Sequence, residues 1–293
     1  MATEPRWADY DYLVEASLRE DRAGEDVTTR ALVPEDLRAE GRIVARQCGV
    51  VCGTPLARRL AERLDPSLEV QTGVPEGAAA RAGDTVAVVH GSARSILTAE
   101  RTMLNFLQRL SGTATLTSRY AEAVKNTDTR ILDTRKTTPG WRELEKHAVR
   151  CGGGHNHRMN LAEQVLIKEN HLRCLHEQSG EVSPVQRAVR LARDQAPKTV
   201  VEVEVETLDG LDAALEAGAE LILLDNMNVE QVRRAARKTA ERRDDDGYPR
   251  LEASGGITLD NVRDYAEAGA DRISIGALTH SAPAMDLSLE LEL

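Results

Sequence analysis

Short apolar runs alternate with amphipathic segments along the chain from about residue 129 onward. The runs are rich in leucine and β-branched residues and predict strands, whereas the segments between them have the apolar spacing that is typical of helices. The predicted strands are TRILDT, VVEVEVET, ELILLDN, LEASGG and DRISIGA, and the predicted helices are LDGLDAALEAGA, NVEQVRRAARKTAERR and TLDNVRDYAEAGA. Alternation of this kind, with a strand every ~20–27 residues, indicates parallel βα units.

A different mixture of helix and strand is predicted for the first ~110 residues. YDYLVEASLRED has helical spacing, and GRIVARQCGVVCG and DTVAVVHGSARSI predict strands. TAERTMLNFLQRLSGTATLTSRYAEAV predicts a long helix with Thr98 as its N-cap, a break at the glycine and a second helix. Further on, Arg142, Glu143, Glu145 and Lys146 have the spacing of a helix surface, so we expect solvated ion pairs there.

Polar or glycine residues stand where the predicted strands end. They are Asp133 and Arg135, Glu204, Asp225, Ser254 with Gly255 and Gly256, and Gly276. The carboxyl ends of successive strands form the active site of a βα barrel. Each residue could instead cap the helix that follows it, but five positions in register favour a site.

The acids of this series have a further implication. Glu202, Glu204 and Glu206 alternate in VEVEVET, so they share one face of a strand, which in a barrel is the interior. A buried acid is costly unless it is paired or binds a metal or a sugar hydroxyl. We expect Glu204 and Asp225 to lie at adjacent strand ends, although helix capping is an alternative role for Asp225.

Cations gather between Asp133 and Arg158, in a chain whose formal net charge is -10. This stretch holds six Lys or Arg and three His but only three acids. A solvated basic face is one explanation. A site for an anionic small molecule is the other, because arginine forks bind carboxylate or phosphate and lysine acts as a point charge. Lys168 follows an apolar strand in LIKENH, which is typical of a buried, functional lysine.

Two glycine-containing loops, SGG at 254–256 and GALTH at 276–280, follow predicted strands near the end of the series. Loops after the last strands of a barrel can hold a phosphate with backbone N–H groups. The whole pattern therefore fits a ligand with carboxylates, one phosphate, and hydroxyls or a metal. A phosphoribosyl donor with an acidic acceptor meets that description.

Composition narrows the possible partners. The acidic balance disfavours nucleic acid, which needs a broad basic surface. The four cysteines, at positions 48, 52, 151 and 174, match no zinc spacing and are expected to be reduced structural thiols. The N-terminal segment lacks the apolar region of a signal peptide, and no apolar run approaches the ~18 residues of a membrane span, so we expect a cytoplasmic protein. The scarcity of lysine is compatible with a high-salt habitat or with codon bias.

Long motifs of the chain resemble the quinolinate phosphoribosyltransferases, also called carboxylating nicotinate-nucleotide pyrophosphorylases. These motifs are EDVTTRALVP, ILTAERTMLNFLQRLSGTAT, DTRKTTPGWRELEKHAVRCGGGHNHRMNLAEQVLIKENH, EVEVETLDGLDAALEAGAELILLDN and LEASGGITLDNVRDYAEAGADRISIGALTHS. They cover nearly the whole chain, and the central one is long and highly specific. One departure is Glu163, where the family more often has Asp.

The resemblance implies an α/β fold with two domains. It implies an N-terminal mixed α/β sandwich, residues 1–110, joined by the C-terminal segment 283–293, and an incomplete, roughly seven-stranded βα TIM-like barrel, residues 111–282. It also implies that quinolinate and phosphoribosyl pyrophosphate (PRPP) become nicotinate mononucleotide, pyrophosphate and carbon dioxide, in de novo NAD biosynthesis. Mg²⁺ is the implied cofactor, and the implied assembly is a homodimer with shared active sites, or a higher oligomer.

The resemblance also implies a role for each matching residue. The residues that hold quinolinate are Arg135, His157, Arg158 and Lys168, with Arg101 from the partner subunit. Those implied for PRPP are Lys136, Glu204, Asp225, Ser254, Gly255, Gly256, Gly276, Ala277 and His280, with Lys136 on the pyrophosphate side. The residues implied to bind Mg²⁺, partly through the substrate, are Glu204 and Asp225. The implied catalytic residues are Lys136, Lys168, Glu204 and Asp225.

Two other functions are compatible with such a barrel. One is a phosphoribosyltransferase of the same fold with another acceptor, either nicotinate or that of the ModD-like proteins of molybdate-transport operons. Arg135, Arg158 and His157 favour a dicarboxylate acceptor over these. The other is a non-catalytic phosphosugar-binding barrel, which the presence of Glu204, Asp225, Lys136 and Lys168 disfavours.

Overall fold

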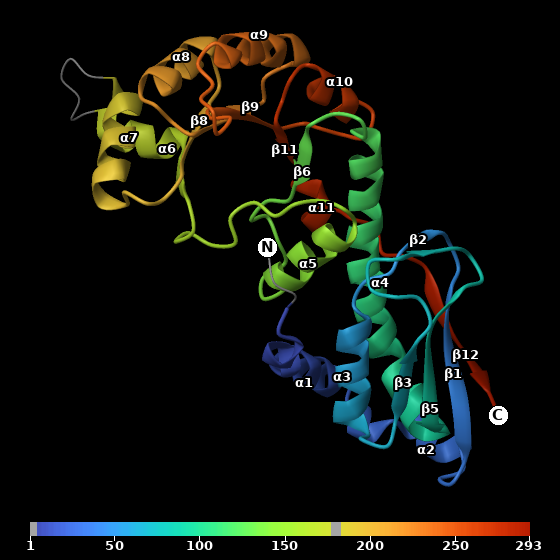
Figure 1. Cartoon of the computed structure of the whole chain (residues 1–293). Helices are drawn as coiled ribbons and strands as arrows, with labels where there is room; N and C mark the ends of the chain where they lie inside the picture. Colours follow the sequence, from blue (N-terminus) through green and yellow to red (C-terminus); the bar gives the residue numbers. More distant parts are fainter. Residues whose placement is uncertain (1–4, 177–182) are drawn as a thin grey trace. The chain divides into compact units, whose positions relative to one another are not determined.

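We describe the protein from a computed structural model that covers residues 5–176 and 183–293. The chain forms two compact units, whose elements Figure 1 labels. The first unit consists of Met1–Ser118, Thr138–Gly153 and Leu278–Leu293, and the second of Arg119–Thr137 and Gly154–Ala277. Each unit is thus made of segments that are separate in the sequence. The domain boundaries expected at residues 110 and 282 remain predictions.

A four-stranded antiparallel sheet, in the order β12-β1-β5-β3, forms the framework of the first unit. Its strands are β1 (Arg38–Ala45), β3 (Glu69–Thr72), β5 (Thr85–Ser92) and β12 (Leu287–Glu292). The short strands β2 (Gly49–Val50) and β4 (Ala79–Ala80) pair with each other. Strand β12 brings the end of the chain beside β1, with Leu287 opposite Ala45.

Helices pack with this sheet around one apolar core. They are η1 (Trp7–Tyr10), α1 (Asp11–Glu20), η2 (Ala23–Glu25), α2 (Val27–Leu32), α3 (Thr54–Leu64), α5 (Arg142–Cys151) and the greater part of α4 (Ala93–Ala123). The side chains of Ile43, Leu56, Ile96, Leu107 and Leu144 in this core have no exposed surface. The helical prediction for YDYLVEASLRED is confirmed by α1.

Helix α4 is continuous, so the predicted break at its glycine is wrong. A Cβ at Gly112 would lie 2.1 Å from the carbonyl oxygen of Pro283. The glycine therefore allows a close approach of the chain near its C-terminal end, and it does not end the helix. Thr98 lies inside α4 and is not an N-cap; its hydroxyl donates to Asp26 at 3.0 Å.

Helix α5 is more deeply buried than its charged sequence indicates. Glu145 and Lys146 have no exposed surface, so the expectation of solvated pairs is wrong for these two residues. The carboxylate of Glu145 accepts hydrogen bonds from the backbone N–H and the hydroxyl of Thr138, and it lies 3.4 Å from Arg109. These contacts compensate the loss of water around the carboxylate.

The second unit contains a six-stranded parallel sheet in the order β6-β11-β10-β9-β8-β7. Its strands are β6 (Arg130–Leu132), β7 (Val165–Ile167), β8 (Val201–Val205), β9 (Leu221–Asp225), β10 (Arg250–Ser254) and β11 (Arg272–Ser274). The first strand, β6, pairs with the last, β11, as in a barrel. His155 adds a parallel bridge to Leu132, which places a further short segment beside β6. The predicted incomplete βα barrel is confirmed.

Helices follow the strands of this sheet, and in Figure 1 α8 and α9 lie outside β8 and β9. They are α6 (Glu169–His176), α7 (Pro184–Gln195), α8 (Leu208–Glu216), α9 (Val229–Ala240), α10 (Val262–Glu267) and α11 (Ala277–His280). Thr207 and Asn228 start two of them by accepting backbone N–H groups of the first turn. Among the helices of the described residues, none has the length and apolar character needed to cross a membrane.

Candidate active site

A cavity of about 610 Å³ opens at the carboxyl ends of the parallel strands of the second unit. Lys168 follows β7 directly, Glu204 lies near the end of β8, and Asp225 is the last residue of β9. The register pairs β8 with β9, so the expected adjacency of Glu204 and Asp225 is confirmed. The lining residues are Thr134, Arg135, Lys136, His157, Arg158, Leu166, Lys168, Glu204, Leu223, Asp225, Asn226, Glu252, Ser254, Gly255, Gly256 and Ser274.

The structure thus brings most of the sequence-predicted site residues into one cavity. Gly276 and Ala277, at the start of α11, are not among the lining residues. His280 and Arg101 belong to the first unit. The roles predicted for these four residues therefore stay predictions.

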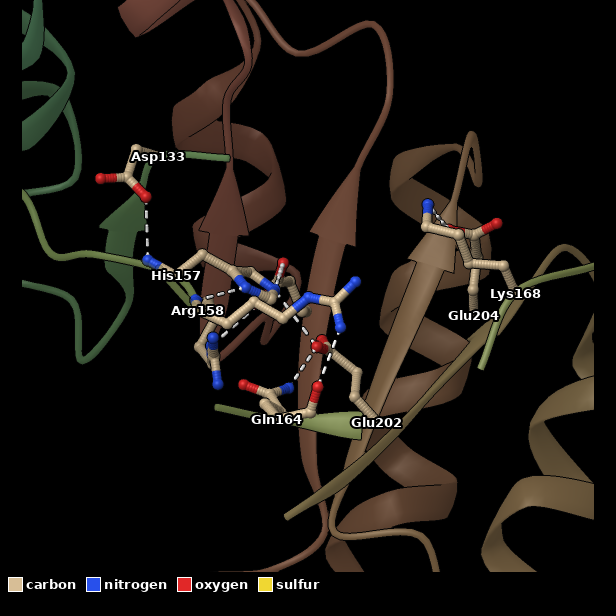
Figure 2. A network of polar contacts seen from close by, with 9 residues as sticks. Asp133, His157, Arg158, Gln164, Lys168, Glu202 and Glu204 are labelled. Carbon is tan, nitrogen blue, oxygen red and sulfur yellow. Dashed lines mark hydrogen bonds and ion pairs between the residues drawn. The ribbon is translucent and has the colours of Figure 1, made fainter. Parts of the chain in front are cut away.

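The segment that carries His157 is held by Asp133, whose side chain is completely buried. One carboxylate oxygen of Asp133 accepts the backbone N–H of His157 at 2.9 Å (Figure 2). The other accepts the side-chain amide of Asn156 at 2.5 Å. His155 adds a backbone hydrogen bond of 2.8 Å to Ile131 in β6. Asp133 is therefore a positioning residue, which fixes His157 and Arg158 relative to the barrel.

His157 lies between two buried carboxylates. Its Nε2 is 3.1 Å from Glu202 and 3.4 Å from Glu252. Burial alone would lower the pKa of His157, but hydrogen bonds to Glu202 and Glu252 outweigh it and raise the pKa to about 9. The Nδ1 atom accepts the backbone N–H of Arg158 at 2.7 Å, so in this geometry Nε2 carries the proton that faces the two carboxylates. A second proton on Nδ1 requires that this contact be broken.

The surroundings shift the pKa values of the two carboxylates in opposite directions. Burial opposes the ionisation of Glu252, but the hydrogen bond from His157 and the charge of Arg272 lower the pKa of this acid; the Nε atom of Arg272 is 2.9 Å away. Burial, and next the charge of Glu252, raise the pKa of Glu202. Glu202 also accepts the amide of Gln164 at 2.6 Å (Figure 2). Glu252 is accordingly the more acidic member of the pair.

Glu252 was missed by the sequence reasoning, although a signal was present. It stands between Leu251 and Ala253 in a buried strand, in the same alternation that marked Glu202 as an interior acid. Of the three alternating acids in β8 and just after it, Glu202 is buried, Glu204 is partly buried and Glu206 is exposed. The two acids that are fully buried in the barrel interior, Glu202 and Glu252, lie beside the nitrogen-bearing side chains of His157 and Arg272.

Two arginines face the cavity together. Burial, and next the charge of Arg135, lower the pKa of Arg158. The Nη1 atom of Arg158 donates to the carbonyl oxygen of Gln164 at 2.8 Å (Figure 2). The buried Nε of Arg135 has no hydrogen-bond partner among the described residues. Two neighbouring guanidinium groups with an unused donor indicate a place for an anion.

Carboxylates and lysines meet elsewhere in the same cavity. The Nζ atom of Lys168 lies 2.8 Å from Glu204 (Figure 2). The side chain of Lys168 is 48% exposed, so the expectation of a buried lysine is wrong. Burial, and next the charge of Glu204, raise the pKa of Asp225, while Lys168 and Lys136 act in the opposite direction. Glu204 and Asp225 are therefore close enough to repel each other.

The loop after β10 passes close to Asn226. Gly255 and Gly256 have φ angles of 94° and 63°, a left-handed region that favours glycine. A Cβ at Gly255 would lie 2.2 Å from the side-chain oxygen of Asn226, whereas one at Gly256 would meet nothing within 4 Å. Asn226 in turn donates to the carboxylate of Asp225 at 2.9 Å. The loop and the acid are thus positioned by the same asparagine.

Arg101 is exposed on α4 in the first unit. It lines a hollow of about 460 Å³ together with Asp21, Glu25 and Asp26. The guanidinium nevertheless forms no ion pair or hydrogen bond with any other residue that the structure describes, including its neighbour Glu100. A structural salt bridge therefore does not account for this arginine.

Comparison with known proteins agrees with the geometry. Residues 26–111 match the model of the quinolinate phosphoribosyl transferase N-terminal domain, and residues 113–290 match that of the C-terminal domain. A nicotinate-nucleotide pyrophosphorylase (carboxylating) of Mycobacterium leprae (strain TN) is 42% identical over 95% of each chain. A probable enzyme of the same name from Methanothermobacter thermautotrophicus is 40% identical over 95% of this chain and 98% of its own.

Solved structures agree over the same length. NadC from Streptococcus pyogenes superposes with a TM-score of 0.89 at 38% identity over 99% of each chain. The nicotinate-nucleotide pyrophosphorylase from Francisella tularensis has a TM-score of 0.89 at 36% identity, over 99% of this chain and 98% of its own. With both domain models matched and relatives aligned over nearly all of its length, the chain belongs to the quinolinate phosphoribosyltransferase family.

Proposed function

We propose that the chain transfers the phosphoribosyl group of PRPP to quinolinate with loss of carbon dioxide, giving nicotinate mononucleotide and pyrophosphate for de novo NAD biosynthesis. The observation that carries this proposal is the pair of Arg135 and Arg158. An unused buried donor on Arg135, beside a second guanidinium whose pKa is lowered, favours a bound carboxylate, and His157 and Lys168 in the same cavity favour a second one. The relatives named above carry the matching activity in their names.

Quinolinate has two carboxylates, and the cations of the cavity suffice for both. Arg135 and Arg158 bind one carboxylate between them, and His157 and the ammonium of Lys168 are available for the second. His157 is held in place by Asp133, Glu202 and Glu252, so its ring is oriented before the substrate arrives. To reach quinolinate, the ammonium of Lys168 has to break its contact with Glu204 or contact Glu204 and the substrate carboxylate at the same time.

PRPP requires partners for its hydroxyls, phosphate and pyrophosphate. Glu204 and Asp225 accept hydrogen bonds from the ribose hydroxyls, and Lys136 lies on the side of the pyrophosphate. The 5′-phosphate lies against the loop of Ser254, Gly255 and Gly256, where Gly256 leaves open space for a ligand to approach the backbone. Gly276 and Ala277, which follow β11, are further candidates for the 5′-phosphate, as is His280.

The acids also fit Mg²⁺. Carboxylate oxygens are its preferred protein ligands, and the mutual repulsion that raises the pKa of Asp225 beside Glu204 is relieved by a shared cation. When bound, Mg²⁺ would neutralise charge on the pyrophosphate as that group leaves. Glu204 and Asp225 would hold it, partly through the substrate.

The chemistry needs no nucleophile from the chain. The carboxylates of Glu204 and Asp225 stabilise positive charge that grows on the ribosyl carbon as its bond to pyrophosphate breaks. The quinolinate nitrogen then bonds to that carbon. The resulting pyridinium accepts the electron pair of the carbon–carboxylate bond when carbon dioxide leaves, and the ring carbon takes up a proton. Lys136 neutralises negative charge on the leaving pyrophosphate, and Lys168 neutralises a carboxylate of the acceptor.

The test is a comparison of acceptors. Labelled quinolinate with PRPP and Mg²⁺ should release carbon dioxide and form nicotinate mononucleotide in equal amounts. Nicotinate with PRPP should give no product, because it lacks the second carboxylate. Product from nicotinate alone would assign the chain to a transferase with another acceptor, and binding of both ligands without turnover would leave a non-catalytic barrel.

We further propose that the active site is shared within a homodimer through Arg101. Its exposed guanidinium, which has no ion-pair partner in the described chain, supports a role toward a second copy. Mixing Arg101→Ala chains with Lys168→Ala chains under subunit exchange should restore activity to about a quarter of the sites, because hybrids of a symmetric dimer have one intact pocket.

The matched control is a mixture of Arg135→Ala and Lys168→Ala chains. Both residues line the same cavity of one chain, so no hybrid pocket is intact and no recovery is expected. Absence of recovery in the Arg101 mixture, with exchange demonstrated by mass, would show that Arg101 acts within its own chain or not at all.

A further inference from the structure

Four potential metal ligands converge in the first unit, and none of them is among the residues assigned to catalysis. They are Cys52, Glu76, His147 and Cys151, and their ligand atoms all lie within 4.8 Å of one another. His147 and Cys151 are one helical turn apart on α5. Cys52 stands just before α3, and Glu76 lies in the loop between β3 and β4. We call these residues the Cys-His-Glu cluster.

The donor atoms point at one place. Nε2 of His147 lies 3.1 Å from the carboxylate of Glu76 and 3.4 Å from the sulfur of Cys151. Both contacts are made to the same ring nitrogen, so they do not form a relay of the kind that activates a nucleophile through the far side of the ring. The other nitrogen, Nδ1, faces Arg150 at 3.3 Å. The carboxylate oxygen, the sulfur and this ring nitrogen are therefore neighbours, as the ligands of one cation are.

The cluster is held rigidly by the backbone around it. Glu76 accepts the N–H groups of Gly53 and Thr54, at 2.7 Å and 3.2 Å. Cys52 donates its own N–H to the hydroxyl of Ser111 and accepts that hydroxyl on its carbonyl oxygen. Cys52 has no exposed surface. Such preorganisation reduces the entropy lost when a metal binds.

We propose that Cys52, Glu76, His147 and Cys151 bind one tetrahedral Zn²⁺ ion. Thiolate, imidazole and carboxylate are the ligands that zinc uses, whereas thiolates disfavour Mg²⁺ and Ca²⁺. Zinc bonds of about 2.0–2.3 Å place tetrahedral ligand atoms roughly 3.3–3.8 Å apart, so donors that lie within 4.8 Å of one another need to close by about 1.5 Å at most. Four protein ligands leave no open position, so the ion is structural and clips α5 to the start of α3.

The first experiment measures metal content. The full chain, without a metal-binding tag, should contain about one zinc per chain after growth with zinc present. Cys52→Ser and Cys151→Ser should each lower this content at least about tenfold. Cys174→Ser is the matched control, because Cys174 is an exposed free thiol in the second unit, and it should keep its zinc.

A second experiment does not depend on the folding of variants. Wild-type protein is stripped with a chelator, reduced and loaded with Co²⁺. A thiolate-to-cobalt charge-transfer band and intense visible bands of tetrahedral cobalt are expected, and zinc should abolish both. If two thiols fail to react with a thiol reagent and become reactive after reduction, the cluster holds a disulfide in place of the metal. Zinc retained by both serine variants, or cobalt bound without thiolate bands, would also overturn the proposal.

Discussion

Alanine at Gly255 and alanine at Gly256 should have very different effects, although the two residues are neighbours with similar backbone conformations. A non-glycine residue at a left-handed φ costs ~1–2 kcal/mol, and this applies to both positions. At Gly255 the new Cβ also has to displace Asn226, whose side-chain oxygen lies 2.2 Å away. Loss of the Asn226 hydrogen bond to the Asp225 carboxylate adds ~1.5–3 kcal/mol. Gly255→Ala should therefore cost ~2.5–5 kcal/mol, against ~1–2 for Gly256→Ala.

Thermal unfolding measures this difference. For a unit of this size each kcal/mol lowers the Tm by roughly 2–4 °C, so Gly255→Ala should unfold roughly 3–12 °C below Gly256→Ala. The KM for PRPP does not separate the two variants, because a methyl group at Gly256 would enter the space left for the 5′-phosphate. Equal Tm values in the two variants would refute the effect of the close approach at Gly255.

Three further predictions concern the charged residues of the cavity. Arg158→Lys and Arg135→Ala should weaken quinolinate binding by ~2–5 kcal/mol, about 30-fold to several thousand-fold, and PRPP binding far less, in calorimetric titrations; near-normal quinolinate affinity would contradict the assignment. Glu204→Gln and Asp225→Asn should lower kcat at saturating Mg²⁺ more than they weaken quinolinate binding, because the charge that they stabilise develops in the transition state; unchanged turnover would leave both as structural acids. The pKa of His157, about 9, should fall in Glu252→Gln, as followed by nuclear magnetic resonance of ¹⁵N-labelled histidine, since burial would then be opposed by one acid fewer. Since this pKa lies above the ordinary value of 6.5, the stabilising effect of His157 should be complete below pH 6.5 and disappear as the pH rises through about 9, and a flat pH profile of stability in this window would argue against it.

Most strands and helices of the second unit are predictable because their apolar period is local. β8, β9 and β10 and the helices after β8 and β9 all lie where the pattern predicts them. The errors in the first unit have tertiary causes. The sequence near Gly112 does not indicate that a glycine is needed there because the backbone of Pro283 passes close by. Likewise, the burial of Glu145 depends on Arg109, which is far away in the chain.

Site residues were predictable where they follow a strand. The rule that polar side chains at strand ends form the site found Lys168, Glu204 and Asp225. It could not find the support of His157, because Asp133, Glu202 and Glu252 act through contacts between strands. The Cys-His-Glu cluster escapes a search for ligand spacing for a similar reason. Its cysteines lie in distant parts of the chain and meet only when α5 packs beside the start of α3.

The pairing of β12 with β1 bears on how the chain is synthesised. β1 is complete once Ala45 has been made, but its partner on one side ends with Glu292. At ~5–20 residues per second, the roughly 250 intervening residues take roughly 10–50 s to translate. During that time the nascent first unit lacks a strand of its sheet, and the N–H and C=O groups on one edge of β1 are free to pair with another chain. A chain whose translation stops before residue 287 therefore keeps an unpaired strand edge on β1. Chaperone binding and degradation should be concentrated on such C-terminally incomplete chains.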